Sequence, residues 1–221
     1  MKHIKTICSG LLAGIIIGLG GLIFSVVMAG AATVAERILA AFLFSIGLLL
    51  ICIFGLNLYT GKIGYVLDNK PRYIIDLGEM LLGNLLGAGL MGLFMRGCSS
   101  QYTSAIEKLG SICEAKFNHP WYTLLLLAIG CGMLVYFAVA IFKSEHHPVL
   151  RIAGLMICVT TFVATGLLHV IAEMFYLVAA NKLDVNSILY IVIILVGNSV
   201  GSIGLHELIK LINKKEKVEV K

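Results

Sequence analysis

Six long hydrophobic blocks constrain this chain more than any other feature of its sequence. They cover approximately residues 7–29, 38–58, 74–94, 121–142, 149–168 with a continuation to 180, and 187–209. A helix needs about 20 mostly apolar residues to cross a bilayer. Hydrophobic residues make up 59% of the 221 and charged residues only 13%, against about 25% charged in soluble domains. The sequence therefore predicts an all-α integral membrane protein with six transmembrane helices in a single domain, residues 1–221.

The first block follows Lys2, His3 and Lys5, so a cleaved signal peptide is an alternative to a transmembrane helix. Its apolar stretch of about 23 residues exceeds the 7–15 typical of signal peptides. This length favours a helix that stays in the membrane.

Lysine and arginine are distributed unequally between the two predicted sides of the membrane. The side that holds the N-terminus carries 12 of the 17, and the other side carries 5. The positive-inside rule then places both termini, including the tail 210–221, in the cytoplasm. Anionic lipid headgroups explain the net charge of +5, so we expect a cell-membrane protein with no nucleic-acid partner.

The six cysteines form no Cys-x-x-Cys pair and no His/Cys cluster with the spacing of a zinc site. We therefore expect no metal and no cofactor. Cys98 and Cys113 share the long outer loop predicted over residues 95–120. An oxidising exterior would allow a disulfide between them. No nucleophile with a base and no phosphate-binding loop is recognisable, so we do not expect an enzyme.

An ionisable pair interrupts the fifth block. Residues 166–174 read Gly-Leu-Leu-His-Val-Ile-Ala-Glu-Met, which places His169 and Glu173 one helical turn apart. An ionisable residue inside a membrane is by default a functional hypothesis. The alternative is a buried hydrogen-bonded pair that only fastens helices together. The residues alone favour neither.

The chain contains an internal repeat. Gly-Asn-x-x-Gly occurs at Gly83, Asn84 and Gly87 and again, 114 residues later, at Gly197, Asn198 and Gly201. A single copy would indicate helix packing. Glycine-marked breaks begin at Gly55 and Gly166, 111 residues apart. Each half holds three predicted spans, so the sequence predicts two inverted repeats, about 7–95 and 121–209, whose interrupted second and fifth helices line a substrate path.

The order of these motifs resembles that of the formate/nitrite transporters. That family has a glycine-rich first span, a Gly-x-Glu-Leu-Phe-Thr-Gly-like break in the second, Gly-Asn-x-x-Gly in the third and sixth, and Phe-Val-x-x-Gly-Phe-Glu-His-x-x-Ala-Asn-Met in the fifth. The counterparts here are residues 14–21, 55–61, 83–87, 197–201 and 162–174. The resemblance implies an aquaporin-like fold and a homopentamer with one pore per protomer, which passes small monovalent anions such as formate, nitrite or hydrosulfide.

The resemblance also implies the residues of the pore. Leu58, Tyr59 and Thr60 would form a loop at a constriction, and His169 would be the central polar residue. Leu58 and Phe175 would guard it on either side, and Arg151, where the family usually has lysine, would attract anions at the inner mouth. An anion loses much hydration energy in an apolar constriction. A histidine with a reference pKa of about 6.5 can supply charge or a proton there, and the Thr60 hydroxyl can donate to the anion.

Three positions depart from the family pattern. Leu168 replaces a glutamate before the histidine, Glu173 replaces an asparagine, and Asn57 replaces the glutamate of the second-span motif. Glu173 is thus a candidate carboxylate partner for His169. An aquaporin-like channel for small neutral solutes is the alternative function. Such channels typically carry paired Asn-Pro-Ala triplets, and this sequence contains none.

Overall fold

The computed structural model describes residues 2–213, and these are predominantly helical. The elements, in order, are α1 (Lys2–Gly30), α2 (Val34–Phe44), α3 (Ile46–Ile53), the 3-10 helix η1 (Ile63–Asp68), α4 (Tyr73–Gly97), α5 (Ser99–Phe117), α6 (Trp121–Ser144), α7 (Pro148–Ala164), α8 (Val170–Ala179) and α9 (Val185–Ile212). Within the described residues, five stretches are long and apolar enough to cross a membrane, namely α1, α2 with α3, α4, α6 and α9. The prediction of an all-α protein with apolar spans is confirmed. The fifth predicted block is divided between the shorter α7 and α8.

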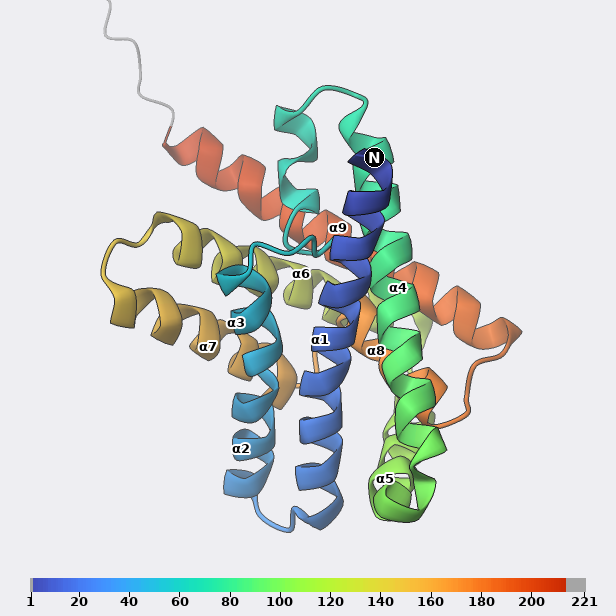
Figure 1. The fold of residues 1–221 in the computed structure, drawn as a ribbon. Coiled ribbons are helices and arrows are strands. Elements are labelled where there is room, and N and C mark those ends of the chain that lie inside the picture. The colour runs from blue at the N-terminus through green and yellow to red at the C-terminus, as the bar shows by residue number, and fades with distance from the viewer. Residues whose placement is uncertain (1, 214–221) are drawn as a thin grey trace, which may run out of the picture.

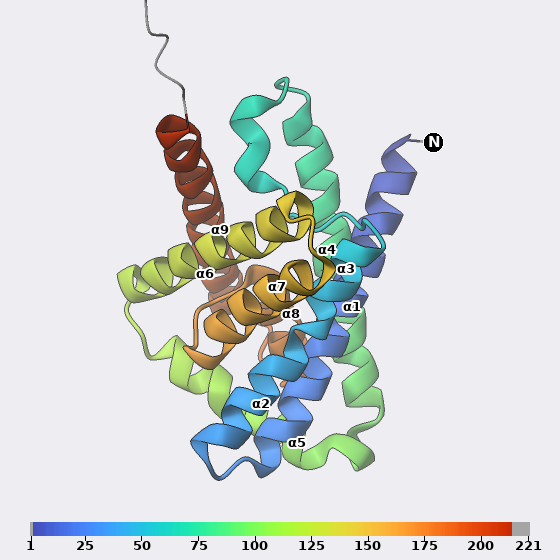
Figure 2. The same ribbon diagram turned by 90° about the vertical axis from the view of Figure 1, so that its left-hand side faces the viewer.

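Two helix pairs form the framework of the molecule. Helix α1 runs beside α4, and α6 packs against α9 (Figure 1). Seen from the side, α6 and α7 lie in the foreground, with α1 and α3 to their right (Figure 2). A Cβ added to Gly87 would lie 2.0 Å from the carbonyl oxygen of Leu11, and one added to Gly201 would lie 2.1 Å from that of Ile129. The two Gly-Asn-x-x-Gly motifs therefore allow the paired backbones to touch.

The breaks begin at the two glycines that the sequence indicated. Gly55 has a φ of 63° and Gly166 a φ of 75°, in the left-handed region that glycine adopts without a steric penalty. Each is followed by an amide that bonds back into the preceding helix: Leu56 N–H donates to Ile51 O and Leu167 N–H to Phe162 O, both at 2.9 Å. This pattern terminates a helix at a left-handed residue.

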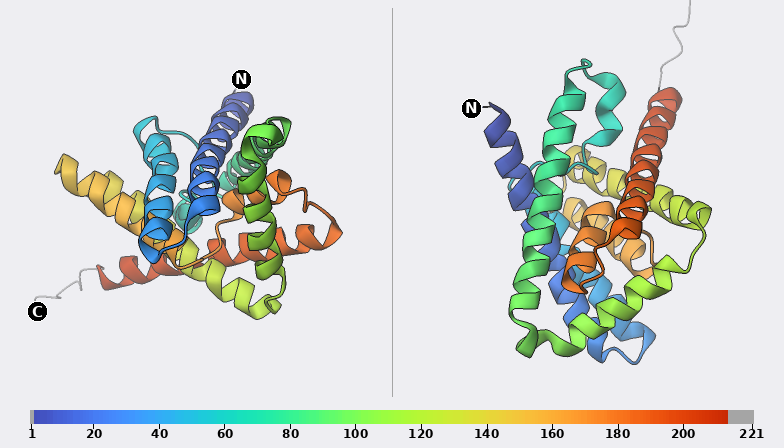
Figure 3. Two further views of the ribbon diagram at one scale, coloured as in Figure 1. Left: turned by 90° about the horizontal axis from the view of Figure 1, so that it is seen from below. Right: turned by 90° about the vertical axis from the view of Figure 1, so that its right-hand side faces the viewer.

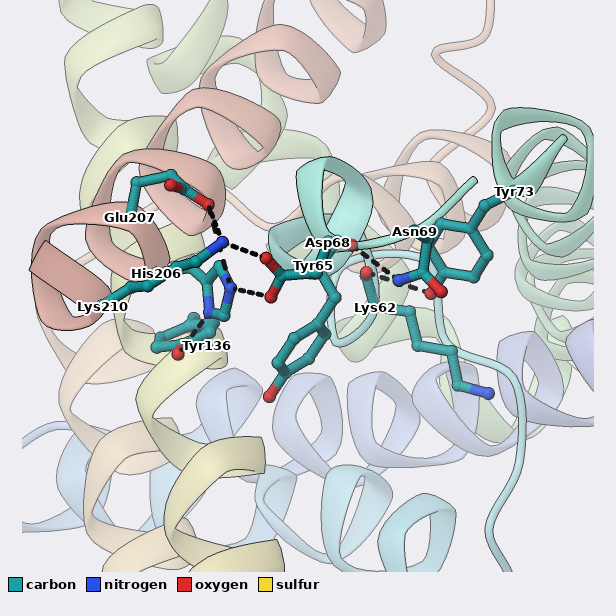
Figure 4. A network of polar contacts seen from close by, with 9 residues as sticks. All are labelled: Lys62, Tyr65, Asp68, Asn69, Tyr73, Tyr136, His206, Glu207 and Lys210. Carbon is teal, nitrogen blue, oxygen red and sulfur yellow. Dashed lines mark hydrogen bonds and ion pairs between the residues drawn. The ribbon is translucent and has the colours of Figure 1, made fainter. Parts of the chain in front are cut away.

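A polar network fastens η1 to α6 and α9 (Figure 4). Asp68 lies 2.6 Å from His206 Nε2 and also forms an ion pair with Lys210, while the Tyr136 hydroxyl lies 2.9 Å from His206 Nδ1. The ammonium of Lys210, and after it His206, hold the pKa of Asp68 below its usual range. The segment that follows the first break is thus held in place from two helices.

Both described chain ends lie on one side of the molecule. Figure 3 shows the start of α1 and the end of α9 together at the top of its right-hand view. Lys2 forms a 3.1 Å ion pair with Asp76 at the start of α4, and His3 is hydrogen-bonded to Glu79. This agrees with the prediction that the termini share a side. Of the predicted tail 210–221, residues 214–221 lie outside the described residues.

The prediction of a long loop over residues 95–120 is wrong. Most of that stretch forms α5, whose buried residues Ala105, Leu109 and Cys113 recur every four positions. This spacing gives the helix one apolar stripe that packs on the protein, although its other faces are too polar for a hydrophobic span. Cys98 and Cys113 are both free thiols.

Candidate functional site

The two breaks meet at a hydrogen bond between Thr60 and His169. Thr60 Oγ1 lies 2.8 Å from His169 Nε2, although 109 positions separate the two residues in sequence. Thr60 is 1% exposed and His169 is 3% exposed. The structure therefore joins the two side chains that the sequence nominated for the centre of a pore.

Asn84 of α4 holds the first break in place. Its Oδ1 accepts a 2.8 Å bond from Tyr59 N–H, and its Nδ2 donates to the carbonyls of Gly10 and Asn57, both at 2.8 Å. One amide side chain thus bonds both to α1 and to the backbone that the break leaves without helical partners. Inside a bilayer no water is available to take that role.

Asn198 of α9 does the same for the second break. Its Oδ1 accepts a 3.0 Å bond from Val170 N–H, and its Nδ2 donates to Ala128 O and Leu168 O, both at 2.8 Å. The partners are again one helix, here α6, and the two sides of the break. The asparagines of the two sequence motifs therefore position the residues on either side of Leu58 and His169.

The hydrogen bonds of His169 define its tautomer. Its ring caps α8: Nδ1 accepts the backbone N–H of Ala172 at 3.3 Å. A nitrogen that accepts carries no proton, so in the neutral ring the proton lies on Nε2 and points at Thr60. Thr60 Oγ1 then accepts from His169, and its own hydroxyl proton remains available to a further acceptor.

Glu173 does not pair with the imidazole. Its carboxylate, 1% exposed, accepts a 2.6 Å bond from Lys116 of α5 and a 2.8 Å bond from the Tyr190 hydroxyl of α9. A charged group is tolerated in the interior when it is paired and hydrogen-bonded. The expected carboxylate partner of His169 is instead one half of an ion pair between α8 and α5.

Two cavities lie on either side of the Thr60–His169 bond. The larger, of about 400 Å³, lies on the side of η1, and Leu58 forms part of its wall together with Lys62, Lys143 and Arg151. The smaller, of about 70 Å³, lies on the side of α5. His169, Phe162, Lys116 and Glu173 are among the residues that line it. His169 thus lies in the wall of the smaller cavity, while Thr60 lies between Leu58 and Gly61, which both line the larger one.

The other nominated residues have different surroundings. Asn57 accepts a 2.6 Å bond from Lys62 Nζ, and the Tyr59 hydroxyl lies 2.9 Å from Ser199 Oγ. Phe175 is fully buried against α1, where a Cβ on Gly21 would lie 2.5 Å from its ring, and it lines neither of these two cavities.

Sequence reasoning missed four residues of these cavity walls: Phe162, Lys62, Lys116 and Lys143. The Phe162 ring centroid lies 5.8 Å from that of His169, so Phe162 occupies the neighbourhood predicted for Phe175. The position of Phe162 at the start of the fifth-span motif is the sequence feature that could have identified it. The three lysines lie 27 to 81 positions apart in sequence and share no pattern, so only the folded chain brings Lys62 and Lys143 to the larger cavity and Lys116 to the smaller one.

Interrupted helices that meet at a buried polar pair, inside a bundle of membrane-length helices, define a multi-pass membrane transport protein. The model of the family described as formate/nitrite transporter matches residues 1–212. The chain therefore belongs to the formate/nitrite transporter family.

Individual relatives have low sequence identity to this chain. The chain is 26% identical over 205 residues to a probable formate transporter of Methanothermobacter thermautotrophicus, a match that covers 78% of this chain and 73% of the relative. It is 27% identical over 189 residues to the formate channel FocA of Escherichia coli strain K12, which covers 79% of this chain and 66% of that protein.

Solved structures show the same fold. A pentameric formate channel with formate bound superposes with a TM-score of 0.83 at 23% identity, over 97% of this chain and 98% of that one. An ion channel of the same family superposes with a TM-score of 0.82 at 20% identity, over 96% and 90% of the two chains.

Proposed function

We propose that this protein is a channel for small monovalent anions of weak acids, of the formate, nitrite or hydrosulfide class, and that His169 and Thr60 form its central polar pair. One observation carries the proposal: the buried 2.8 Å contact between Thr60 and His169 where the two breaks meet. Relatives that are named formate transporter and formate channel support the choice of a small anion as the substrate. The aquaporin-like alternative gains no support from these relatives.

The hydrogen bonds suggest how the pair acts. An anion at the Leu58 constriction has lost much of its water, and the free proton of the Thr60 hydroxyl offsets part of that cost. Protonation of His169 at Nδ1 would remove the acceptor of Ala172 N–H, so the imidazolium is costly unless an anion lies beside it. Anion and proton would then bind together, and the neutral acid that they form crosses apolar surroundings more easily.

The same proposal includes the architecture. We assign six membrane crossings to two inverted repeats, about 7–95 and 121–209, with α7 and α8 together forming the fifth crossing. The equivalent bonding of Asn84 and Asn198 supports this assignment. We further propose a homopentamer with one pore per protomer, because the fold matches that of a pentameric formate channel. Both termini would be cytoplasmic, where most of the lysine and arginine residues then lie.

Anion entry into proteoliposomes tests the function. Formate, nitrite, hydrosulfide, lactate and chloride are compared at acidic and neutral pH, with glycerol as a neutral solute. We expect rapid, strongly pH-dependent entry of one or more weak-acid anions and little entry of chloride. Glycerol entry without anion entry would contradict the proposal and support a channel for neutral solutes.

Two substitutions test the role of His169. His169→Leu should abolish anion entry, because it removes the polar group at the constriction. His169→Asn retains a side chain that can cap α8 but cannot take up a proton, so any remaining entry should lose its pH dependence. His119→Asn, at an exposed histidine outside both cavities, is the matched control and should behave as the unmodified protein. Unchanged entry in His169→Leu would refute the assigned role.

A further inference from the structure

The larger cavity has three basic side chains in its wall, contributed by three different segments. Lys62 follows the first break, Lys143 lies in the last turn of α6, and Arg151 lies in the first turn of α7. No aspartate or glutamate within residues 2–213 lines it. The remaining wall is largely apolar, so the cavity combines a concentrated positive charge with surroundings that screen charge poorly.

The three cations have no counter-charge among the described residues. Lys62 donates to the neutral amide oxygen of Asn57, at the position where the family pattern has a glutamate. The Lys143 ammonium lies 4.9 Å above the Tyr65 ring, and the Arg151 guanidinium 4.4 Å above the Phe142 ring. Contacts with aromatic faces orient a cation but leave its charge uncompensated.

The nearest carboxylate in sequence is engaged elsewhere. Glu145, two residues after Lys143, accepts the backbone N–H of His147 at 2.9 Å. At the cavity wall itself, Arg151 Nε is shielded from solvent and has no hydrogen-bond acceptor within the described part of the chain. A buried donor without a partner destabilises the fold, so an anion that accepted from Arg151 would remove an existing penalty.

The charge of an anion decides whether it stays in this cavity or moves on. Attraction to three cations grows in proportion to the anion's charge. The cost of dehydration at the Leu58 constriction grows with the square of that charge in the Born description. A monovalent anion can therefore be drawn in and passed on, whereas a divalent anion is held more strongly and cannot proceed.

We propose that the cavity bounded by Lys62, Lys143 and Arg151 is a binding site for a divalent phosphate-type anion, which blocks the channel from the side that carries the chain termini. The planar guanidinium of Arg151 suits two phosphate oxygens at once, and the lysines add point charges. The volume of about 400 Å³ accommodates inorganic phosphate or a small phosphate monoester. Binding is independent of the proposed function, whereas block of transport rests on it.

Calorimetric titration of the purified protein at pH 7.5 tests the binding step. Inorganic phosphate and glycerol phosphate are the two probes, with chloride at matched ionic strength as the monovalent comparison. We expect phosphate binding that weakens at least about tenfold in Arg151→Gln and in Lys143→Gln, as loss of one hydrogen bond to a charged group predicts. Lys143 is exposed, so its variant keeps the test valid if Arg151→Gln does not fold.

Lys70→Gln is the matched control, because Lys70 is an exposed lysine beside η1 that does not line the cavity. It should bind phosphate as the unmodified protein does. Equal binding of chloride and phosphate, or equal phosphate affinity in all three variants, would overturn the proposal. Tighter binding of glycerol phosphate than of inorganic phosphate would identify a monoester as the source of the phosphate group.

Anion entry into proteoliposomes tests the block. Phosphate on one face only should inhibit entry, and the half-inhibiting concentration should rise at least about tenfold in Arg151→Gln relative to Lys70→Gln. Inhibition that is equal from both faces would refute a site on one side. Phosphate binding without any anion transport would count against the proposed function and leave the binding site intact.

Discussion

At the scale of single residues, the pairing of Glu173 gives a sharp test. Lys116→Met leaves this carboxylate buried with only Tyr190 as a partner, and breaking one side of a buried ion pair costs about 3–5 kcal/mol. We therefore expect a marked fall in the thermal unfolding temperature of the purified protein. The double variant Lys116→Met/Glu173→Gln should recover much of the loss, because a neutral amide can still accept from Tyr190.

Lys182→Met is the matched control for this experiment. Lys182 pairs with Glu114 at 2.7 Å, but both side chains are exposed, and exposed ion pairs contribute about 0–1 kcal/mol. Equal effects of Lys116→Met and Lys182→Met, or no recovery in the double variant, would show that the Lys116–Glu173 pair does not act as the geometry indicates.

The sequence predicted the central residues better than their partners. His169 was identifiable as an ionisable residue inside an apolar block, and Thr60 through the resemblance to the formate/nitrite transporters; the structure brings the two side chains to 2.8 Å. The partner of Glu173 was not identifiable from the sequence, because Lys116 is 57 positions away and reaches Glu173 only where α5 folds back over α8. The short distance in sequence between His169 and Glu173 suggested instead that these two residues pair. Residues one turn apart can face each other only while the helix continues, and here His169 is the residue before the helix starts.

At the scale of helices, the contact between α1 and α4 depends on the absence of a side chain at Gly87. In Gly87→Ala the new Cβ would lie 2.0 Å from a backbone oxygen of α1, so the helices must separate and the protein should unfold at a lower temperature. Gly78→Ala is the control in the same helix, because nothing lies within 4 Å of the added Cβ and alanine favours the helix by about 1 kcal/mol. Equal unfolding temperatures would contradict close packing at Gly87.

The membrane-length helices were predictable from hydrophobicity. The ends of α3 and α7 were predictable from Gly55 and Gly166. Helix α5 was not, because it is too polar for a span and its apolar stripe consists only of a few well-spaced residues such as Ala105 and Leu109. A search for long hydrophobic runs passes over such a helix. A search for four-residue periodicity in the loop would have found it.

At the scale of the whole molecule, the network at Asp68 connects the first break to the second half of the chain. Asp68 ends η1, eight residues after Thr60, and its partners His206 and Lys210 lie in α9, which also carries Asn198 (Figure 4). Helix α9 thus contacts the surroundings of both central residues: through Asn198 at His169 and through Ser199 and His206 at the segment around Thr60. A displacement of α9 would therefore disturb the surroundings of Thr60 and His169 together.

The orientation of the molecule in the membrane provides the final prediction. Helix α4 separates Lys70 from the exposed Glu107 of α5, so single cysteines at these two positions should lie on opposite sides. In a protein whose Cys8 and Cys98 are serine, a membrane-impermeant maleimide should label Glu107→Cys in intact cells and Lys70→Cys only after the membrane is opened, because the proposed orientation places the lysine-rich side in the cytoplasm. Labelling of both positions from one side would contradict the crossing by α4, and the reverse pattern would place the termini outside. Solubilised protein, in which both cysteines should react, shows that neither is hidden by the fold.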